Sequence, residues 1–126
     1  MTRIYLFRGT RVMIDRDLAA LYQVDTRTLN QAVRRNKTRF PDDFMFQLNP
    51  FEFANWKSQF VTFKSLRIGL RKRPWVFTEQ GIAMLSSVLN SELAIQMNIR
   101  IIRIFTRMRK LLETHQEILQ RLMVLE

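Results

Sequence analysis

Residues 15–40 read DRDLAALYQVDTRTLNQAVRRNKTRF, a pattern that predicts two short helices joined by a tight turn. In the first helix, Leu18, Leu21 and Tyr22 follow the i, i+3, i+4 spacing of a single buried face. Gln23 stands in the turn where such motifs usually have glycine, so the turn is expected to differ from the usual one. The arrangement is typical of a helix-turn-helix.

Polar residues at the start of each helix predict how its exposed amides are capped. Asp15 or Asp17 can cap the first helix. The second helix can begin at Asp25, or at Thr28 with Gln31 as its capping-box partner three residues on.

The outward face of the second helix carries donors suited to nucleic acid. Its side chains are Arg27, Asn30, Gln31, Arg34 and Arg35. Guanidinium forks and amides match the edges of guanine and adenine in the major groove, and they also bind phosphates beside it. The alternative interpretation is a solvated helix face in a small α-rich domain.

The charge balance favours a polyanionic partner. The 126 residues include 21 Lys and Arg against 11 Asp and Glu, a formal net charge of +10 with a pI near 11.2. The densest basic segment is KSLRIGLRKR at residues 64–73, with five cations and no acid: Lys64, Arg67, Arg71, Lys72 and Arg73. A solvated loop is the ordinary explanation of such a run, but here a second phosphate-binding element lies in the same chain.

Short β-type runs surround these helices. Residues 4–7 and 12–14 predict a hairpin with Gly9 in its connection, and the alternation at residues 44–48 predicts a half-buried strand. Residues 61–63 and 75–77 predict a two-stranded wing with the basic segment at its tip.

Two further helices have recognisable starts. Asn49, Pro50 and Glu52 predict an N-cap, a first helical position and a capping-box partner, for a helix that buries Phe53, Trp56 and Phe60. Thr78 predicts the cap of the next helix, which ends before residue 90.

A heptad pattern occupies the C-terminal segment and predicts one long helix. Apolar residues and one histidine recur in alternating steps of four and three, which places them in one stripe, the seam of the helix. They are Met97, Ile101, Ile104, Met108, Leu111, His115, Ile118, Leu122 and Leu125. Phe105, Leu112 and Leu119 widen this stripe, which favours a multi-helix bundle or docking onto the body over a bare two-stranded coil. We expect an interface with further copies, as a dimer or tetramer, and a natural chain that continues past Glu126; the alternative is an intramolecular core helix.

Several classes of function are disfavoured by composition. The chain has no cysteine, one histidine and scattered carboxylates, so we expect no catalytic residue, no metal site, no cofactor and no enzymatic activity. Its three glycines are widely separated, which argues against phosphate-binding loops. No apolar run suits a signal peptide or a membrane helix, so the cytoplasm of a bacterial host is the expected location and no membrane partner is expected.

Four motifs carry a resemblance to a known family. They are DRDLA with LY at residues 15–22, LNQAVRRN at 29–36, RFP with DFMF at 39–46, and FTEQG with MLS at 77–86. With them the chain resembles, over roughly residues 4–106, the ORF-six N-terminal domain family of phages and prophages, which is grouped with KilA-N and Bro-N domains. The resemblance implies a small α+β DNA-binding domain of antirepressor-like or regulatory proteins, fused to a variable C-terminal partner. It places Asn30, Gln31, Arg34 and Arg35 in the nucleic-acid-facing segment, whereas residues 64–73 depart from the glycine-richer sequences of similar proteins.

The sequence therefore predicts an α+β chain with two parts. Residues 1–90 form a winged-helix-like domain with a helix-turn-helix, and residues 91–126 form a long oligomerisation helix. The predicted function is a sequence-specific regulator of phage type that reads double-stranded DNA with helix 26–39. The alternatives are an antirepressor module that binds a repressor or other regulatory protein through the C-terminal helix, and an RNA-binding protein.

Overall fold

The computed structural model describes residues 3–60 and 72–124, which contain four strands and five α-helices. The strands are β1 (Tyr5–Phe7), β2 (Thr10–Ile14), β3 (Met45–Gln47) and β4 (Trp75–Thr78). The helices are α1 (Asp15–Tyr22), α2 (Thr26–Arg35), α3 (Pro50–Phe60), α5 (Glu79–Leu89) and α6 (Glu92–Val124), with a 3-10 turn, η1, at Lys37–Arg39. The predicted α+β class is confirmed.

The predicted hairpin is present, and its turn is tighter than the sequence suggested. Phe7 pairs with Thr10, so only Arg8 and Gly9 lie between the strands. Both have positive φ, +55° and +71°, as a type I′ turn requires. Glycine accepts this conformation without strain, whereas Arg8 adopts it despite its Cβ.

The sheet is fully antiparallel, in the order β1-β2-β4-β3. Strand β4 pairs with β2 on one side and with β3 on the other. A strand has only two edges, so the prediction that residues 75–77 pair with residues 61–63 as a wing is wrong. Residues 61–63 themselves lie outside the described residues.

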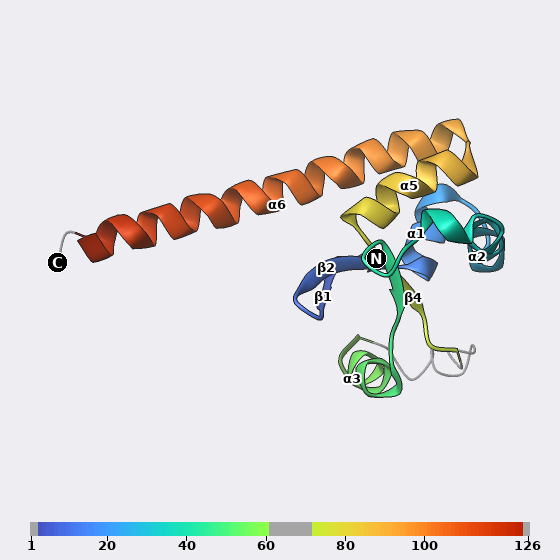
Figure 1. Ribbon diagram of the computed structural model, residues 1–126, viewed down its shortest axis with the longest axis horizontal. Coiled ribbons are helices and arrows are strands. Elements are labelled where there is room, and N and C mark those ends of the chain that lie inside the picture. Colours follow the sequence, from blue (N-terminus) through green and yellow to red (C-terminus); the bar gives the residue numbers. More distant parts are fainter. Residues whose placement is uncertain (1–2, 61–71, 125–126) are drawn as a thin grey trace.

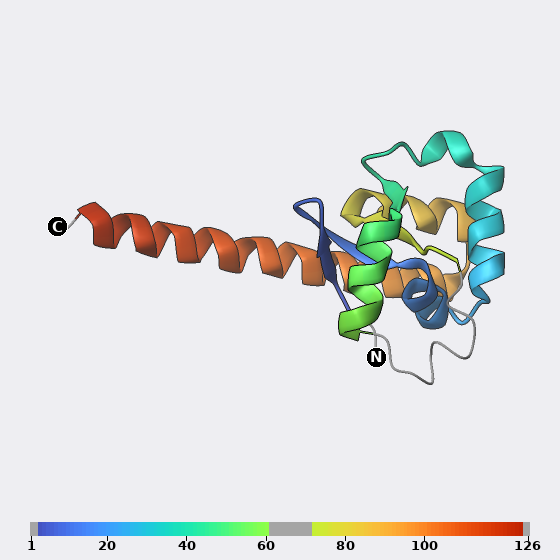
Figure 2. The same cartoon turned by 90° about the horizontal axis from the view of Figure 1, so that it is seen from below.

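Helices cover both faces of the sheet (Figures 1 and 2). Val12, Ile14 and Val76 point to one face, where they form a core with Phe53 and Trp56 of α3. Because strand side chains alternate, their neighbours Met13 and Phe77 point to the opposite face. There a larger core forms with α1, α2, α5 and α6, mainly through Leu18, Tyr22, Leu29, Val33, Ile82, Leu85, Ile101 and Phe105.

Two helix starts follow their predicted caps. In α3 the Asn49 side chain accepts from the Glu52 amide at 2.7 Å, and Glu52 accepts from the Asn49 amide at 2.8 Å. In α5 the Thr78 hydroxyl accepts from the amide of Gly81 at 3.4 Å. The predicted burial of α3 is correct at its first two anchors, but Phe60, at the last residue of the helix, remains 41% exposed.

Helix α6 is a single 33-residue element, about 50 Å long at 1.5 Å per residue. Its first half packs on the body through Ala94, Asn98, Ile101 and Phe105, all buried, so this part of the predicted oligomerisation helix belongs to the core. Its second half extends beyond the body in Figure 1, and the side chains from residue 109 to residue 123 are exposed.

A buried polar chain fixes α6 to the helices beneath it. The Tyr22 hydroxyl donates to Asn98 Oδ1, and Asn98 Nδ2 donates to the Ile82 carbonyl at 2.7 Å. Burial raises the pKa of the Tyr22 phenol, which therefore stays protonated as a donor. One side chain of α6 thus links the end of α1 to α5.

Candidate nucleic-acid interface

The turn between α1 and α2 consists of residues 23–25 and is closed by backbone hydrogen bonds. The amide of Gln23 donates to the Ala20 carbonyl at 3.2 Å, and that of Val24 donates to Ala19 at 3.0 Å. Gln23 has φ +57° and ψ 43°, the left-handed conformation that glycine usually supplies in this Schellman arrangement. The two predicted helices and their tight turn are therefore present, with glutamine in the glycine position.

The caps predicted for these helices form only in part. Asp25 is the N-cap residue of α2, one of the two predicted positions, but its side chain makes no capping bond. Ile14 is the N-cap residue of α1, so Asp15 lies in the first turn, where its carboxylate accepts from the amide of Arg16. Thr28 lies inside α2, so the capping box predicted with Gln31 does not form.

Asp15 has a different role, because it is buried between three elements. Its carboxylate accepts a hydrogen bond from Asn30 Nδ2 at 3.0 Å. It also accepts from the backbone amides of Arg16 at 2.8 Å and Trp75 at 3.4 Å. Burial raises the pKa of Asp15, while these hydrogen bonds act in the opposite direction. The carboxylate joins α1 to α2 and to β4, and so positions α2.

This contact separates Asn30 from the other predicted reading residues. Its side chain is half-buried and its amide nitrogen is bound to Asp15, so in this conformation Asn30 supports α2 from within. Arg27, Arg34 and Arg35 are exposed, and Gln31 is half-buried between them on the helix surface. Spacings of four and three along α2 bring Arg27, Gln31 and Arg34 onto one face.

The positive charge on this face of α2 is not balanced by ion pairs within the described residues. Within residues 3–60 and 72–124, ion pairs form between Arg8 and Glu52 and between Arg109 and Glu79. No arginine of α2 takes part in either pair, so the face presents three guanidinium groups to solvent. Such a surface attracts polyanions over a distance set by the ionic strength.

The predicted reading helix, residues 26–39, ends earlier than expected. Helix α2 ends at Arg35, and the chain continues as η1. Arg39 donates to the Ser87 hydroxyl at 3.1 Å, which fixes η1 against α5. Lys37, which was not among the predicted residues, is exposed just after α2. The sequence signal for it is a further cation within one turn of Arg34.

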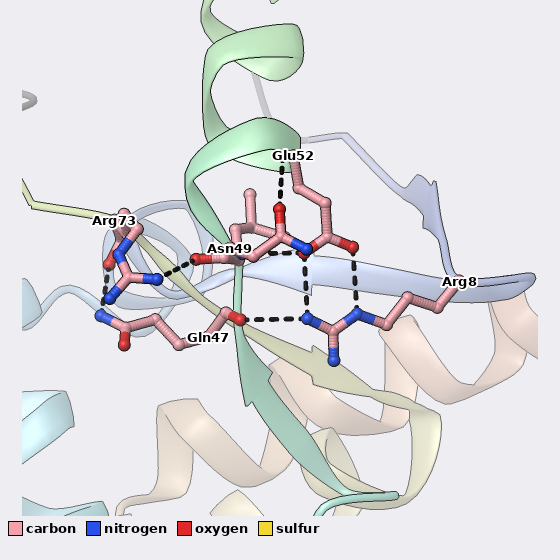
Figure 3. Close-up of polar contacts among 6 residues, drawn as sticks. Arg8, Gln47, Asn49, Glu52 and Arg73 are labelled. Carbon is pink, nitrogen blue, oxygen red and sulfur yellow. Dashed lines mark hydrogen bonds and ion pairs between the residues drawn. The ribbon is translucent and has the colours of Figure 1, made fainter.

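Only the end of the predicted basic segment can be placed. Lys64, Arg67 and Arg71 lie outside the described residues, whereas Lys72 and Arg73 are exposed. Arg73 Nη1 donates to the Leu48 carbonyl at 3.3 Å, and the Arg73 carbonyl accepts from Gln47 Nε2 at 3.1 Å (Figure 3). These bonds hold the end of the segment beside β3.

The predicted oligomer-interface residues fall into two groups. Ile101 is buried in the body and Met97 is half-buried against it, so the start of the seam is covered by the chain itself. Met108 is half-buried, Leu125 lies outside the described residues, and the rest are exposed: Ile104, Leu111, His115, Ile118 and Leu122.

Metal clusters and membrane-spanning helices are two further features to look for in the described part of the chain. No cluster of three or more His, Asp or Glu side chains there could hold a metal ion. None of the described helices is long and apolar enough to cross a membrane.

Fold and surface together define an α+β chain with a tight two-helix unit, a basic helix face and a projecting C-terminal helix. A family model described as the ORF6N domain matches residues 2–88, well over half of the sequence. The chain belongs to the ORF6N domain family. The matched region includes the whole sheet and helices α1, α2 and α3 with most of α5, and it ends before α6. Comparisons with curated proteins and with solved structures gave no match.

Proposed function

We propose that this chain is a regulator of phage type that binds double-stranded DNA in a sequence-specific manner. The observation that carries the proposal is the face of α2, where three exposed arginines flank Gln31 directly after a tight turn. A helix in this position of a helix-turn-helix inserts in the major groove. The net charge of +10 favours the approach to a polyanion.

The residues are assigned different roles. Gln31 and Arg34 read base edges, because amides and guanidinium forks discriminate adenine and guanine. Arg27 and Arg35 at the borders of this face bind bases or adjacent phosphates. Cations of segment 64–73 contact phosphates, and Asn30 positions α2 through Asp15.

Selection from random duplex DNA tests the proposal most directly. An enriched motif is expected, with a binding constant that decreases steeply between about 50 and 200 mM salt. Arg34→Ala should lower the preference for that motif by about 1–3 kcal/mol. Arg103→Ala, at an exposed site on α6, is the matched control for loss of one charge. Absence of duplex binding at about 50 mM salt would refute the proposal.

We further propose that the projecting half of α6 pairs with the same segment of other copies, as a dimer or tetramer. The face that packs on the body continues along the helix through Leu112, Leu119 and Leu122, which are exposed. Leu111 and Ile118 extend the stripe, and a heptad repeat pairs best with a helix of the same repeat.

Light scattering on two double variants tests this pairing. Leu111→Asp with Ile118→Asp should yield monomers, because buried carboxylates oppose helix pairing. Gln116→Asp with Gln120→Asp adds the same charge at exposed polar positions and should leave the assembly intact. A monomeric native chain would refute the pairing.

The exposed stripe also favours a second candidate function, an antirepressor that binds a repressor or other regulatory protein through α6. The two candidates differ in the DNA selection. An antirepressor of this kind gives no enriched motif, and the α2 variants leave its activity unchanged.

A further inference from the structure

A groove of about 640 Å³ is lined by β1 and α3. Helix α3 lies on the opposite face of the sheet from α1, α2, α5 and α6 (Figures 1 and 2). The strand contributes its whole length and the helix contributes its outward turns, including Phe51, Asn55 and Gln59. The groove contains none of the residues assigned above to DNA binding.

Exposed apolar side chains gather around this groove. Outside α6, the large apolar side chains exposed in the described part of the chain are Leu6, Phe51, Phe60 and Trp75. The side chains of Phe51 and Phe60 line the groove, with exposed fractions of 76% and 41%. Leu6 lines it at the edge of β1, and its side chain points to the other face of the sheet because its neighbours Tyr5 and Phe7 face α3. Apolar side chains concentrated at one hollow mark an interaction site more often than scattered ones do.

Aromatic rings form the walls. Tyr5 meets Phe60 edge to face at 4.9 Å between ring centroids, and the Arg3 guanidinium lies 5.5 Å from the centre of the Phe60 ring. Trp56 is buried in the same wall, and its Nε1 has no hydrogen-bond acceptor among the described residues. The groove therefore has an aromatic wall that is anchored in the core through Trp56.

Strand β1 adds a backbone edge, because it is the first strand of the sheet and, among the described residues, pairs with β2 alone. Phe7 and Thr10 close a two-residue turn, so they form a hydrogen-bonded pair. Pairs alternate along an antiparallel ladder, so Leu6, opposite Arg11, directs its N–H and C=O away from β2. An extended chain can pair with these two groups.

The charge at the groove is small and positive. The Arg8 guanidinium donates to both carboxylate oxygens of Glu52 at 3.0 Å, so these charges neutralise each other (Figure 3). Arg3 remains without an ion pair to a described residue. One carboxylate on a ligand would complement it.

We propose that the groove binds an extended peptide segment of a partner protein, which adds to β1 as a further strand. The segment has apolar side chains at alternate positions, directed toward Phe51 and Phe60, and an acidic residue beside Arg3. Single-stranded nucleic acid fits less well, since a single net charge offers little to a phosphate backbone.

The ligand for binding measurements is obtained by panning the full chain against a phage-displayed library of random ten-residue peptides. The enriched peptides should carry an acid and alternating apolar residues, and one of them is synthesised for anisotropy measurements. Phe51→Ala should weaken its binding at least fivefold and leave duplex-DNA binding unchanged. Arg3→Glu should weaken it about tenfold, whereas Arg103→Glu on α6 should not.

Strand addition has its own readout at Leu6. Hydrogen exchange of the Leu6 amide should slow when the peptide binds, while that of Phe7, already in the ladder, should not change. Leu6→Pro removes the outward N–H and should abolish binding, whereas Leu6→Ala retains the N–H and should keep most of it.

Three outcomes would overturn the proposal. They are a library without an enriched peptide, enriched peptides insensitive to Phe51→Ala, and unchanged exchange at Leu6. A single-stranded oligonucleotide that displaces the peptide, and whose own binding is lost in Phe51→Ala, would assign the groove to nucleic acid instead.

Discussion

At Gly81 a single added methyl group should destabilise the fold, because the backbone of Phe44 lies against it. A Cβ built on Gly81 would lie 2.0 Å from the carbonyl oxygen of Phe44 and 2.9 Å from its carbonyl carbon. Observed Cβ contacts essentially never fall below 3.0 Å, so the backbone near Phe44 would have to move by about 1 Å. That carbonyl also accepts from the Thr78 amide at 3.0 Å and from the Thr78 hydroxyl at 3.2 Å.

The expected effect of Gly81→Ala combines three contributions. Overpacking against a backbone atom costs about 1–3 kcal/mol. Weakening of the two hydrogen bonds from Thr78 costs roughly 1–2 kcal/mol more. Alanine returns about 1 kcal/mol through its helix propensity. The free energy of unfolding should therefore fall by about 1–4 kcal/mol, and Tm by roughly 5–15 °C for a chain of this size.

Urea and thermal denaturation of the full chain measure this change. Ala83→Gly, at an exposed site of the same helix, reports the propensity contribution alone and should cost about 1 kcal/mol. A Gly81→Ala protein as stable as the native chain would contradict the close approach of the Phe44 backbone, just before β3, to α5.

Three further predictions concern local contacts. Gln23→Gly should raise the free energy of unfolding by up to about 1 kcal/mol in urea denaturation, because it removes the cost of a Cβ in the left-handed conformation; a loss would contradict this. Tyr22→Phe and Asn98→Leu should each cost about 1–3 kcal/mol and the double variant less than their sum, since each single change leaves a buried partner unpaired; additive losses would argue against the contact. The Arg8 hydrogen bond lowers the pKa of Glu52, so the ionised carboxylate stabilises the fold above its unfolded pKa of about 4.3, and this stabilisation is lost as pH falls through the folded value. The native chain should therefore lose more stability than Arg8→Met between about pH 5 and 3, and equal losses would refute the assignment.

Features that depend on neighbours in sequence could be predicted well. The two-helix unit, the capping box of Asn49 and Glu52, and the Thr78 cap all involve residues within a few positions of each other. Hairpin formation was predictable for the same reason, although the sequence suggested a longer connection than the Arg8–Gly9 turn.

Features that depend on distant residues could not be predicted. The place of β4 between β2 and β3 joins segments more than 25 residues apart, and no local pattern specifies it. Asp15 resembled a helix cap, but its contact with Trp75 is visible only once the sheet is formed. Asn30 was assigned to the outer face by helical spacing, which cannot show that a buried carboxylate binds its amide.

The polar contacts within the body imply that α2 and α6 keep a fixed relation. Asn30 ties α2 to Asp15 at the start of α1, and Tyr22 at the end of α1 is tied to Asn98 of α6. Each contact is buried or half-buried, so breaking it leaves a polar group without a partner. If the projecting half of α6 pairs two copies as proposed, this pairing sets the distance between their α2 helices. Half-sites on duplex DNA would then have a defined spacing of about one helical turn or a multiple of it, independent of the bases read by Gln31 and Arg34.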